Sequence, residues 1–261
     1  AGVDRLLTPE LVEHDIIITN YSGAQASNMA EHIMAMMFAF ARALPLLIRR
    51  QMANEWTKQP PDELPRLPPT RYFSRFTVEL SRQTLAIVGL GQVGRELAKD
   101  AKGVGMRVLG SRRRPGALPE GVDRLYGPED WFEMLAEADH VAICAPLTSR
   151  TQHLFGEAEL KAMKSTAYIY NTSRGAIIDQ DALLRALETG EIAGAGLDVT
   201  TPEPLPADSP LWQMPNVLIT CHTSGASPHI EERGFEIVVE NIRRYRADEP
   251  LLNLVDKREG Y

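Results

Sequence analysis

The stretch Thr84–Gly94, TLAIVGLGQVG, decides the fold. It opens with an apolar run that predicts a buried strand, and a helix-like pattern follows it. Between the two, Gly89, Gly91 and Gly94 have the spacing G-x-G-x-x-G. In a strand–turn–helix unit the first glycine permits the tight turn, the second lets the backbone approach a pyrophosphate, and the third lets the helix pack on the strand. The stretch therefore predicts dinucleotide binding, and a glycine-rich turn without a ligand is the weaker alternative.

From this stretch onward the chain alternates apolar runs with helical patterns, which predicts a doubly wound parallel α/β sheet, a Rossmann fold. The expected strands are 85–89, 107–110, 140–144, 167–171, 193–198 and 217–221, and the expected helices are 92–103, 129–136, 156–162, 179–189 and 227–247. In such sheets the ligand lies outside the carboxyl ends of the strands. The residues that follow each strand are therefore the functional candidates.

The segment before the glycine turn predicts two further elements. Residues 16–19, three isoleucines and a threonine, are all β-branched and predict a short strand. Residues 27–53 carry apolar side chains at steps of three and four, which predicts a long helix capped by Ser27 and kinked or divided at Pro45.

This helix and the proline-rich stretch after it point to an assembly. Ile33, Met36, Met37 and Phe40 give the helix more apolar surface than one sheet face needs. Residues 56–78 are too long and proline-rich for a simple connector, so they form either a mobile surface loop or an arm that lies on a second subunit. We therefore expect a homodimer with two-fold symmetry through the helix and the arm.

Composition narrows the class of protein. The formal charge of −7 disfavours binding to nucleic acid or to an anionic membrane surface. Cys144 and Cys221 each end an apolar run, so both are expected to be buried and reduced, without a disulfide framework or a metal site. No apolar run approaches the roughly 20 residues of a membrane span, and no signal peptide is visible. We expect a cytoplasmic protein that uses no metal.

Three ionisable residues follow strands of the expected sheet: Arg174, Glu203 and His222. A histidine beside a carboxylate forms an acid–base pair, and an arginine can hold a substrate carboxylate through its planar fork of donors. With a nicotinamide cofactor these groups suit hydride transfer to a 2-oxo acid. Singly, the histidine could be a structural hydrogen-bonding residue and the glutamate a loop charge; their convergence on one sheet edge favours catalysis.

The end of the second strand carries a clue to the cofactor. In NAD-binding turns an acidic residue at this place bonds the ribose hydroxyls. Here the sequence has Ser111, Arg112, Arg113 and Arg114 and no carboxylate. Because arginine matches phosphate in charge and geometry, we expect NADP to be preferred and NAD to remain possible. The alternative is a solvated basic loop.

Several separated motifs resemble the D-isomer-specific 2-hydroxyacid dehydrogenases, of the glyoxylate/hydroxypyruvate reductase kind, over nearly the whole chain. They are the glycine turn, Ala145–Thr148 with Thr151, Asn171–Ala176 with Asp179, Gly196–Val199 leading to Pro202–Pro204, and Cys221–Gly225. The resemblance implies that the chain transfers a hydride between NAD(P)H and a small 2-oxo acid or D-2-hydroxy acid.

The resemblance also implies roles for single residues. Arg174 is similar to the substrate-binding arginine, Glu203 to the carboxylate that keeps the histidine protonated, and His222 to the proton donor. Asp198 is similar to the aspartate that contacts the nicotinamide carboxamide. The cofactor site would include the pyrophosphate-lining Gln92 and Val93, the ribose- and nicotinamide-lining Pro146, Thr151 and Thr172, and also Ser173 and Gly225, and Gly2 would join Arg174 and His222 at the substrate.

The same resemblance implies a domain division. Residues 24–225 would form the dinucleotide-binding domain, and residues 1–23 and 226–261 would be remnants of a smaller, flavodoxin-like substrate domain. Family members begin with a further segment that builds most of that domain, so the substrate loop at Gly2 is expected to be truncated. Two alternatives stay open: a dinucleotide-sensing regulatory protein on the same fold, and an enzyme resembling formate dehydrogenase, against which Glu203 argues because a glutamine is typical there.

Overall fold

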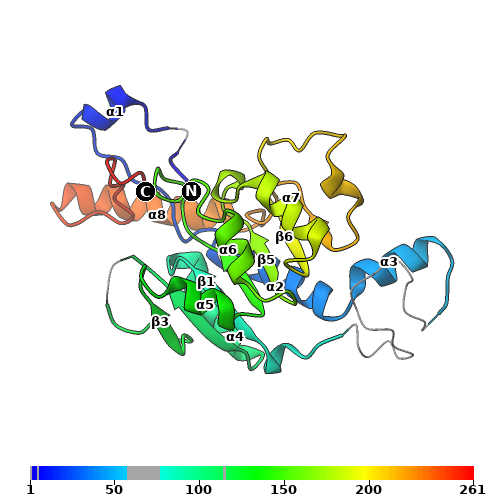
Figure 1. Ribbon diagram of the computed structural model, residues 1–261. Helices are drawn as coiled ribbons and strands as arrows, with labels where there is room; N and C mark the ends of the chain where they lie inside the picture. The colour runs from blue at the N-terminus through cyan, green and yellow to red at the C-terminus, as the bar shows by residue number, and fades with distance from the viewer. Residues whose placement is uncertain (1, 5, 58–76, 114–115) are drawn as a thin grey trace.

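The centre of the protein is a seven-stranded parallel sheet with the order β3-β2-β1-β4-β5-β6-β7 (Figure 1). A computed structural model describes residues 2–4, 6–57, 77–113 and 116–261. The strands are β1 Thr84–Val88, β2 Arg107–Ser111, β3 Arg124–Tyr126, β4 His140–Ile143, β5 Tyr168–Asn171, β6 Gly194–Leu197 and β7 Val217–Ile219. All six strand pairs are parallel, which confirms the predicted doubly wound fold.

Helices α2 Ala26–Ala41 and α4 Gln92–Gly103 cover one face of this sheet, and α5 Trp131–Glu137, α6 Glu157–Ala162 and α7 Gln180–Thr189 cover the other. The described residues also form α1 Pro9–Glu13, α3 Leu44–Met52 and α8 Ile230–Arg246, and the short 3-10 turns η2 Leu80–Arg82, η3 Gly175–Ile177 and η4 Pro210–Gln213. Successive side chains of a strand point to opposite faces. Leu85 and Ile87 therefore pack with α2 and α4, whereas Ala86 and Val88 pack in the core beneath α5, α6 and α7.

The order of the strands sets where ligand-facing loops meet. β1 lies between β2 and β4, and its last residue, Val88, is level with Ser111 of β2 and Ile143 of β4. The glycine turn after β1 therefore has the loop after β2 on one side and the loop after β4 on the other. At the opposite side of the molecule from α3, α8 extends beside α1, where the two chain ends lie (Figure 1).

The long helix expected at 27–53 is two helices, α2 and α3, bent by 70°. Pro45 lies in the first turn of α3, where its missing N–H breaks no helical bond, so the predicted division is confirmed. The prediction that Ser27 caps the helix is wrong, because α2 begins one residue earlier and its N-cap is Gln25. No single helix in the described ranges is long and apolar enough to cross a membrane; α2 and α3 pass that test only as a bent pair.

Other local predictions were also wrong. Residues 16–19 form no strand: Thr19 makes one isolated antiparallel bridge to Leu254, and Ile16 and Ile17 are exposed. β3 was not predicted, because three residues with an exposed arginine give no recognisable alternation. Cys221 is exposed, contrary to expectation, whereas Cys144 is partly covered and burial raises the pKa of its thiol to about 12.

The apolar side chains of α2 that were expected to face a second subunit are buried within the chain itself. Ile33 and Met37 are fully buried, and Met36 and Phe40 are at most 8% exposed. They pack against α4 and one face of the sheet, and the Phe40 ring stacks on Tyr168. These four residues therefore cannot form a subunit interface, and most of the proline-rich arm lies outside the described residues.

Candidate active site

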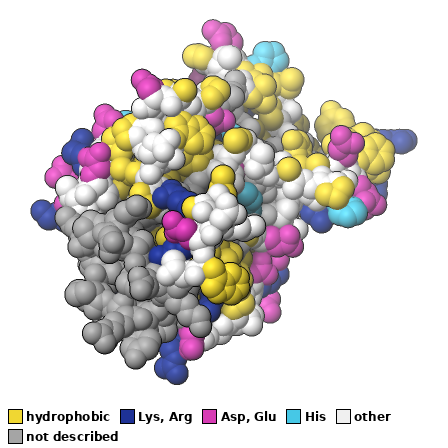
Figure 2. All heavy atoms as spheres, turned by 90° about the vertical axis from the view of Figure 1, so that its right-hand side faces the viewer, with side chains coloured by type: hydrophobic (Ala, Val, Ile, Leu, Met, Phe, Trp, Pro, Cys, Tyr) yellow, Lys and Arg dark blue, Asp and Glu magenta, His cyan; other side chains and the backbone are white. Residues whose placement is uncertain are grey.

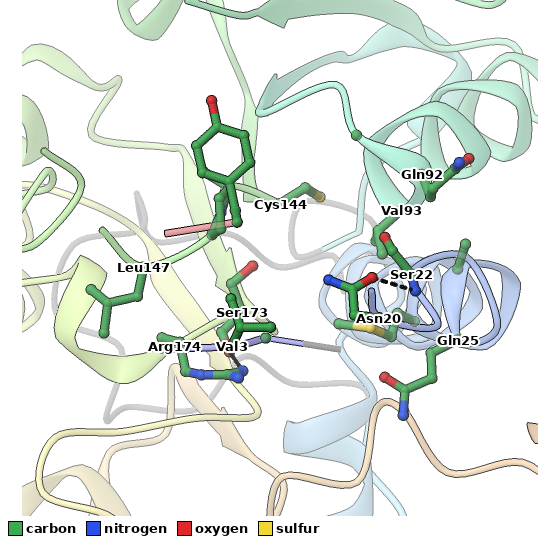
Figure 3. A pocket seen from close by; sticks show the side chains of 18 of the residues that line it. Val3, Asn20, Ser22, Gln25, Gln92, Val93, Cys144, Leu147, Ser173 and Arg174 are labelled. Atoms are coloured by element: carbon green, nitrogen blue, oxygen red, sulfur yellow. Dashed lines mark hydrogen bonds between the residues drawn. The ribbon is translucent and has the colours of Figure 1, made fainter. Parts of the chain in front are cut away.

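A cavity of about 790 Å³ opens at the carboxyl ends of the strands. Loops after β1, β4, β5 and β7 line it, together with residues 2–4 and the last residues of the chain. Figure 3 shows Ser173 and Arg174 on one side of this cavity and Gln92 and Val93, at the start of α4, on the other. The cavity has the size and position of a ligand site in an open α/β sheet.

The glycine turn is shaped for a ligand's phosphates. Gly89 has a φ of +99°, which favours glycine, and a Cβ on Gly94 would lie 2.1 Å from the carbonyl oxygen of Gly89. Gly91 lines the cavity, and a Cβ there would meet no atom within 4 Å, so the backbone is open to a bound molecule. The N-terminus of α4 adds free N–H groups and a positive dipole end. On the facing loop, the buried Thr172 hydroxyl has no hydrogen-bond partner among the described residues. The residues present therefore fit a dinucleotide.

His222 and Glu203, which the sequence predicts to be an acid–base pair, are in contact. The Nδ1 atom of His222 is 2.6 Å from Oε1 of Glu203, and both side chains are partly exposed. Because the carboxylate holds Nδ1, the other ring nitrogen, Nε2, is the one that can serve a ligand. His222 has a φ of +55°, a left-handed conformation that is uncommon for a residue with a side chain.

Asp198 explains how the backbone of His222 is held. The His222 N–H donates to the Asp198 carbonyl at 2.8 Å. The Asp198 carboxylate accepts hydrogen bonds from the Thr220 hydroxyl at 2.5 Å and from the backbone N–H groups of Thr223 and Ser224 at 2.9 Å. Burial alone would raise the pKa of Asp198, but these hydrogen bonds outweigh it and the pKa is lowered. The buried carboxylate thus fixes the turn that carries His222, and its contact with a nicotinamide stays a prediction.

Arg174 is held by an acidic residue that is far away in sequence. Its Nε and Nη2 atoms contact Oδ1 of Asp4 at 3.1 and 3.0 Å, and its Nη1 donates to the Ser173 carbonyl at 2.8 Å. The segment is close-packed here, because a Cβ on Gly2 would lie 2.1 Å from the Arg174 guanidinium. Asp4 was not predicted, because nothing in its local sequence indicates a contact 170 positions away.

The basic loop after β2 makes several hydrogen bonds within the chain, and one of its N–H donors has no partner among the described residues. Arg112 donates from Nη2 to the Ala117 carbonyl at 2.8 Å, and its buried Nε has no partner among the described residues. Arg113 donates from Nη1 to Glu259 at 2.5 Å and from Nη2 to the Tyr261 hydroxyl at 2.7 Å. Arg114 lies outside the described residues.

The model of the family "D-isomer specific 2-hydroxyacid dehydrogenase, NAD binding domain" matches residues 34–224. The chain belongs to this family. As a D-isomer specific 2-hydroxyacid dehydrogenase it transfers a hydride between NAD(P)H and a 2-oxo acid or the matching 2-hydroxy acid, as the motifs predicted.

Individual relatives agree with this assignment. A glyoxylate reductase of Korarchaeum cryptofilum is 36% identical over 98% of this chain and 74% of its own length. A glyoxylate/hydroxypyruvate reductase B of Salmonella newport is 35% identical over 92% of this chain and 71% of its own length.

Solved structures show the same fold. A dehydrogenase of this family from Xanthobacter autotrophicus Py2, in complex with NADPH and MES, has a TM-score of 0.82 at 34% identity, and the match covers all of both chains. An NADPH-dependent glyoxylate/hydroxypyruvate reductase from Sinorhizobium meliloti, in complex with NADP and sulfate, has a TM-score of 0.85 at 26% identity over all of this chain and 78% of the other.

Most of the residues predicted for the site of this dehydrogenase come together. Those that line the cavity are Gly2, Gly91, Gln92, Val93, Pro146, Thr172, Ser173, Arg174, His222 and Gly225. Those that lie behind the lining or beyond it are Gly89, Gly94, Ser111, Arg112, Arg113, Thr151, Asp198 and Glu203. Thr151, for example, contacts a lining residue, because its hydroxyl donates to the Pro146 carbonyl at 2.6 Å.

Other lining residues were not predicted. They include Ser224, which lies within the Cys221–Gly225 motif, and residues from segments that no motif marks: Val3, Asp4, Asn20, Ser22, Gln25, Glu259 and Tyr261. Among the described residues, no group of three His, Cys, Asp or Glu side chains is placed to hold a metal ion.

Proposed function

We propose that this dehydrogenase reduces a small 2-oxo acid of the glyoxylate or hydroxypyruvate kind, with NADPH as the preferred cofactor. The observation that carries the proposal is the convergence of the His222–Glu203 pair and Arg174 on the cavity that the glycine turn also lines. The names of the Korarchaeum and Salmonella relatives support the substrate class.

Each side chain of the site has a separate role in the proposed reduction. Arg174, oriented by Asp4 and the Ser173 carbonyl, presents its remaining N–H donors to the substrate carboxylate and carbonyl. His222 gives a proton from Nε2 to the substrate oxygen, and Glu203 stabilises the charged ring before transfer. A bound nicotinamide supplies the hydride. Gly89–Gly94, Thr172 and Ser173 would hold the dinucleotide.

The assay that tests this function follows the oxidation of NADPH and NADH with glyoxylate, hydroxypyruvate and pyruvate as substrates. We expect turnover with at least one of the first two, and a higher kcat/KM with NADPH than with NADH. Binding of a dinucleotide without turnover on any 2-oxo acid would favour a sensor, the alternative function on this fold. Oxidation of formate by NADP⁺ would favour the formate dehydrogenase alternative.

Arg112 supports the NADPH preference. It follows β2, where no carboxylate is present to bind ribose hydroxyls, and its buried Nε lacks a partner among the described residues. The Xanthobacter and Sinorhizobium structures contain NADPH and NADP. A hydrogen bond to a charged group contributes about 1.5–3 kcal/mol, so Arg112→Ala is expected to raise KM for NADPH about tenfold or more and to leave KM for NADH nearly unchanged. Equal kcat/KM values of the native enzyme for both cofactors would contradict the preference.

We also propose a homodimer, but through different residues from those first expected. α3 projects from the body of the molecule (Figure 1). Figure 2 views the molecule from the side of α3, and hydrophobic side chains gather on this side. Its exposed apolar residues are Leu44, Leu47, Ile48 and Met52, with Trp56 just beyond, 99% exposed. An apolar face of this kind is typical of a subunit interface.

We propose the domain division at residues 24–225, with 1–23 and 226–261 contributing to the substrate domain. The match of the family's NAD-binding domain to residues 34–224 supports the first part. The cytoplasmic location stays a prediction from the sequence.

A further inference from the structure

The last six residues of the chain form a compact turn beside the cofactor cavity. The Asp256 carboxylate accepts hydrogen bonds from the backbone N–H groups of Arg258 and Glu259, and the Asp256 N–H donates to the Tyr261 carbonyl at 3.0 Å. The Gly260 N–H donates back to the Asp256 carbonyl at 2.8 Å. Asp256, Glu259, Gly260 and Tyr261 line the same cavity as the glycine turn. The turn therefore presents its side chains to the cofactor site from a fixed backbone.

One carboxylate oxygen in this turn contacts two arginines. Oε2 of Glu259 accepts from Nη1 of Arg113 at 2.5 Å and also from Nη2 of Arg150. The second terminal nitrogen of Arg113 donates to the Tyr261 hydroxyl, and the guanidinium lies over the Tyr261 ring, 5.8 Å from its centre. The hydrogen bond from Arg113 lowers the pKa of Glu259, so the carboxylate is ionised at neutral pH. Arg113 is thus engaged at both of its terminal nitrogens by the chain's own residues.

The topology places this ion pair across the cofactor site. Arg113 follows β2 and Arg150 follows β4, whereas β1 and its glycine turn lie between those two strands. Glu259 therefore joins the loops on either side of the turn where a dinucleotide's phosphates bind. A carboxylate that accepts from two guanidiniums occupies donors that a phosphate group would otherwise use.

We propose that Glu259 is a specificity-determining residue, which competes with the 2′-phosphate of NADPH for Arg113 and so limits the preference for NADPH over NADH. The proposal rests on the proposed function, in which the loop after β2 receives the 2′-phosphate. NADH has hydroxyls at that place and does not need Arg113 to leave Glu259. Binding of NADPH must exchange the Arg113–Glu259 contact for an Arg113–phosphate contact, with Tyr261 released from Arg113 in the same exchange.

The test measures dissociation constants of NADPH, NADH, 2′,5′-ADP and 5′-AMP for the native protein and for Glu259→Gln. The two nucleotide fragments differ only by the 2′-phosphate. Because the ion pair is partly exposed, we expect NADPH and 2′,5′-ADP to bind about two- to fivefold more tightly to the variant. The dissociation constants of NADH and 5′-AMP are expected to stay within about twofold of the native values.

Three further comparisons test whether the effect is specific to Glu259 and Arg113. Glu188→Gln changes the net charge equally at an exposed position on α7 and is expected to behave like the native protein. Tyr261→Phe is expected to tighten NADPH binding in the same direction but less. In an Arg113→Ala background, Glu259→Gln is expected to have no further effect on NADPH binding, because the shared donor is gone.

Weaker or unchanged NADPH binding by Glu259→Gln, or an equal gain for NADPH and NADH, would overturn the competition. In those cases the native protein still binds dinucleotides and the proposed function stands. Failure of the native protein to bind either dinucleotide would instead overturn the proposed function, and this inference with it.

Discussion

At the scale of single residues, the geometry of His222 is set by its surroundings more than by its own preference. A residue with a side chain adopts a φ of +55° only where the surrounding structure requires it. Here Asp198 imposes this conformation. Its carboxylate accepts hydrogen bonds from the N–H groups of Thr223 and Ser224, which follow His222, and from the hydroxyl of Thr220. The ring is thereby directed to Glu203 on one side and to the cavity on the other.

Glu203→Gln tests the charge in this pair. The amide keeps the size of the side chain but lacks the charge that stabilises the imidazolium, so proton donation by His222 is expected to be less effective. We predict a lower kcat for reduction, whereas the dissociation constant of NADPH stays the same. A kcat identical to that of the native enzyme would mean that the carboxylate is only structural.

His222→Ala tests the proton donor itself. General acid catalysis typically contributes about a hundredfold to ten-thousandfold, so a loss of kcat in that range is expected with little change in NADPH affinity. Steady-state kinetics and equilibrium binding on the same preparation separate the two effects. A variant that keeps more than a tenth of the native kcat would exclude His222 as the principal donor.

At the scale of elements, the unit of β1, the glycine turn and α4 contains three glycines with different surroundings. Gly94 is fixed by packing, because a Cβ there would overlap the Gly89 carbonyl. A Cβ on Gly91 would meet no atom within 4 Å, and this residue lines the cavity. A Cβ on Gly103, at the end of α4, would also meet no atom within 4 Å, but this residue lies away from the cavity.

Alanine at these three positions therefore separates folding from binding. Gly94→Ala is expected to lower the free energy of unfolding by about 1–3 kcal/mol through overpacking. Gly91→Ala is expected to unfold like the native protein but to bind NADPH at least about tenfold more weakly, since its methyl group occupies the path of the phosphates. Gly103→Ala is the control, with native binding and a stability equal to or up to about 1 kcal/mol above native. Urea unfolding and NADPH titration check all three, and native-like NADPH binding by Gly91→Ala would contradict a phosphate site at this turn.

At the scale of the whole molecule, a buried histidine links stability to pH. His140 is 1% exposed at the start of β4, with Nδ1 2.9 Å from the Tyr170 hydroxyl and Nε2 2.7 Å from the Gln83 amide oxygen. Burial lowers the pKa of His140 to about 4. In the unfolded chain its pKa is about 6.5, so the unfolded state binds a proton first as the pH falls.

Its contribution to stability is therefore complete above about pH 6.5 and is lost as the pH falls towards 4. From these two pKa values we predict that this residue alone removes about 2 kcal/mol of the free energy of unfolding between pH 7 and pH 5. Urea unfolding at both pH values checks this, with His140→Asn as the comparison, because other groups titrate equally in both proteins. An equal loss of stability in the native protein and the variant would contradict the assignment.

The association of subunits is tested at the same scale. Leu47 and Ile48 lie on α3 and are 37% and 52% exposed. If α3 forms the interface, Leu47→Glu with Ile48→Glu is expected to convert a dimer to a monomer in sedimentation at micromolar concentration, with the fold unchanged by circular dichroism. Met34→Leu, a conservative change within the buried face of α2, serves as the control. A native protein that sediments as a monomer would rule out the proposed assembly.

Some features of the fold and of the site could be predicted from the sequence, and others could not. The strands and the glycine turn were predictable, because apolar runs and glycine spacing are local and their physical reasons are local too. The proximity of Glu203 and His222 was predictable because both follow strands of one parallel sheet. The contacts of Asp4 and Glu259 and the burial of the apolar face of α2 were not, because a contact across the chain or a buried face depends on tertiary packing. The four apolar residues of α2 show this best, since the same pattern fits a core and a subunit interface.

Both ends of the described chain stand beside the reacting groups. Asp4 holds Arg174 and Glu259 holds Arg113, and residues at both ends line one cavity. A polyhistidine sequence placed within a few residues of Asp4 or Glu259 would therefore lie near the active site, where its imidazoles can bind phosphate or accept protons. Kinetic constants and pH profiles of this enzyme should accordingly be compared only between preparations that carry no such sequence near these positions.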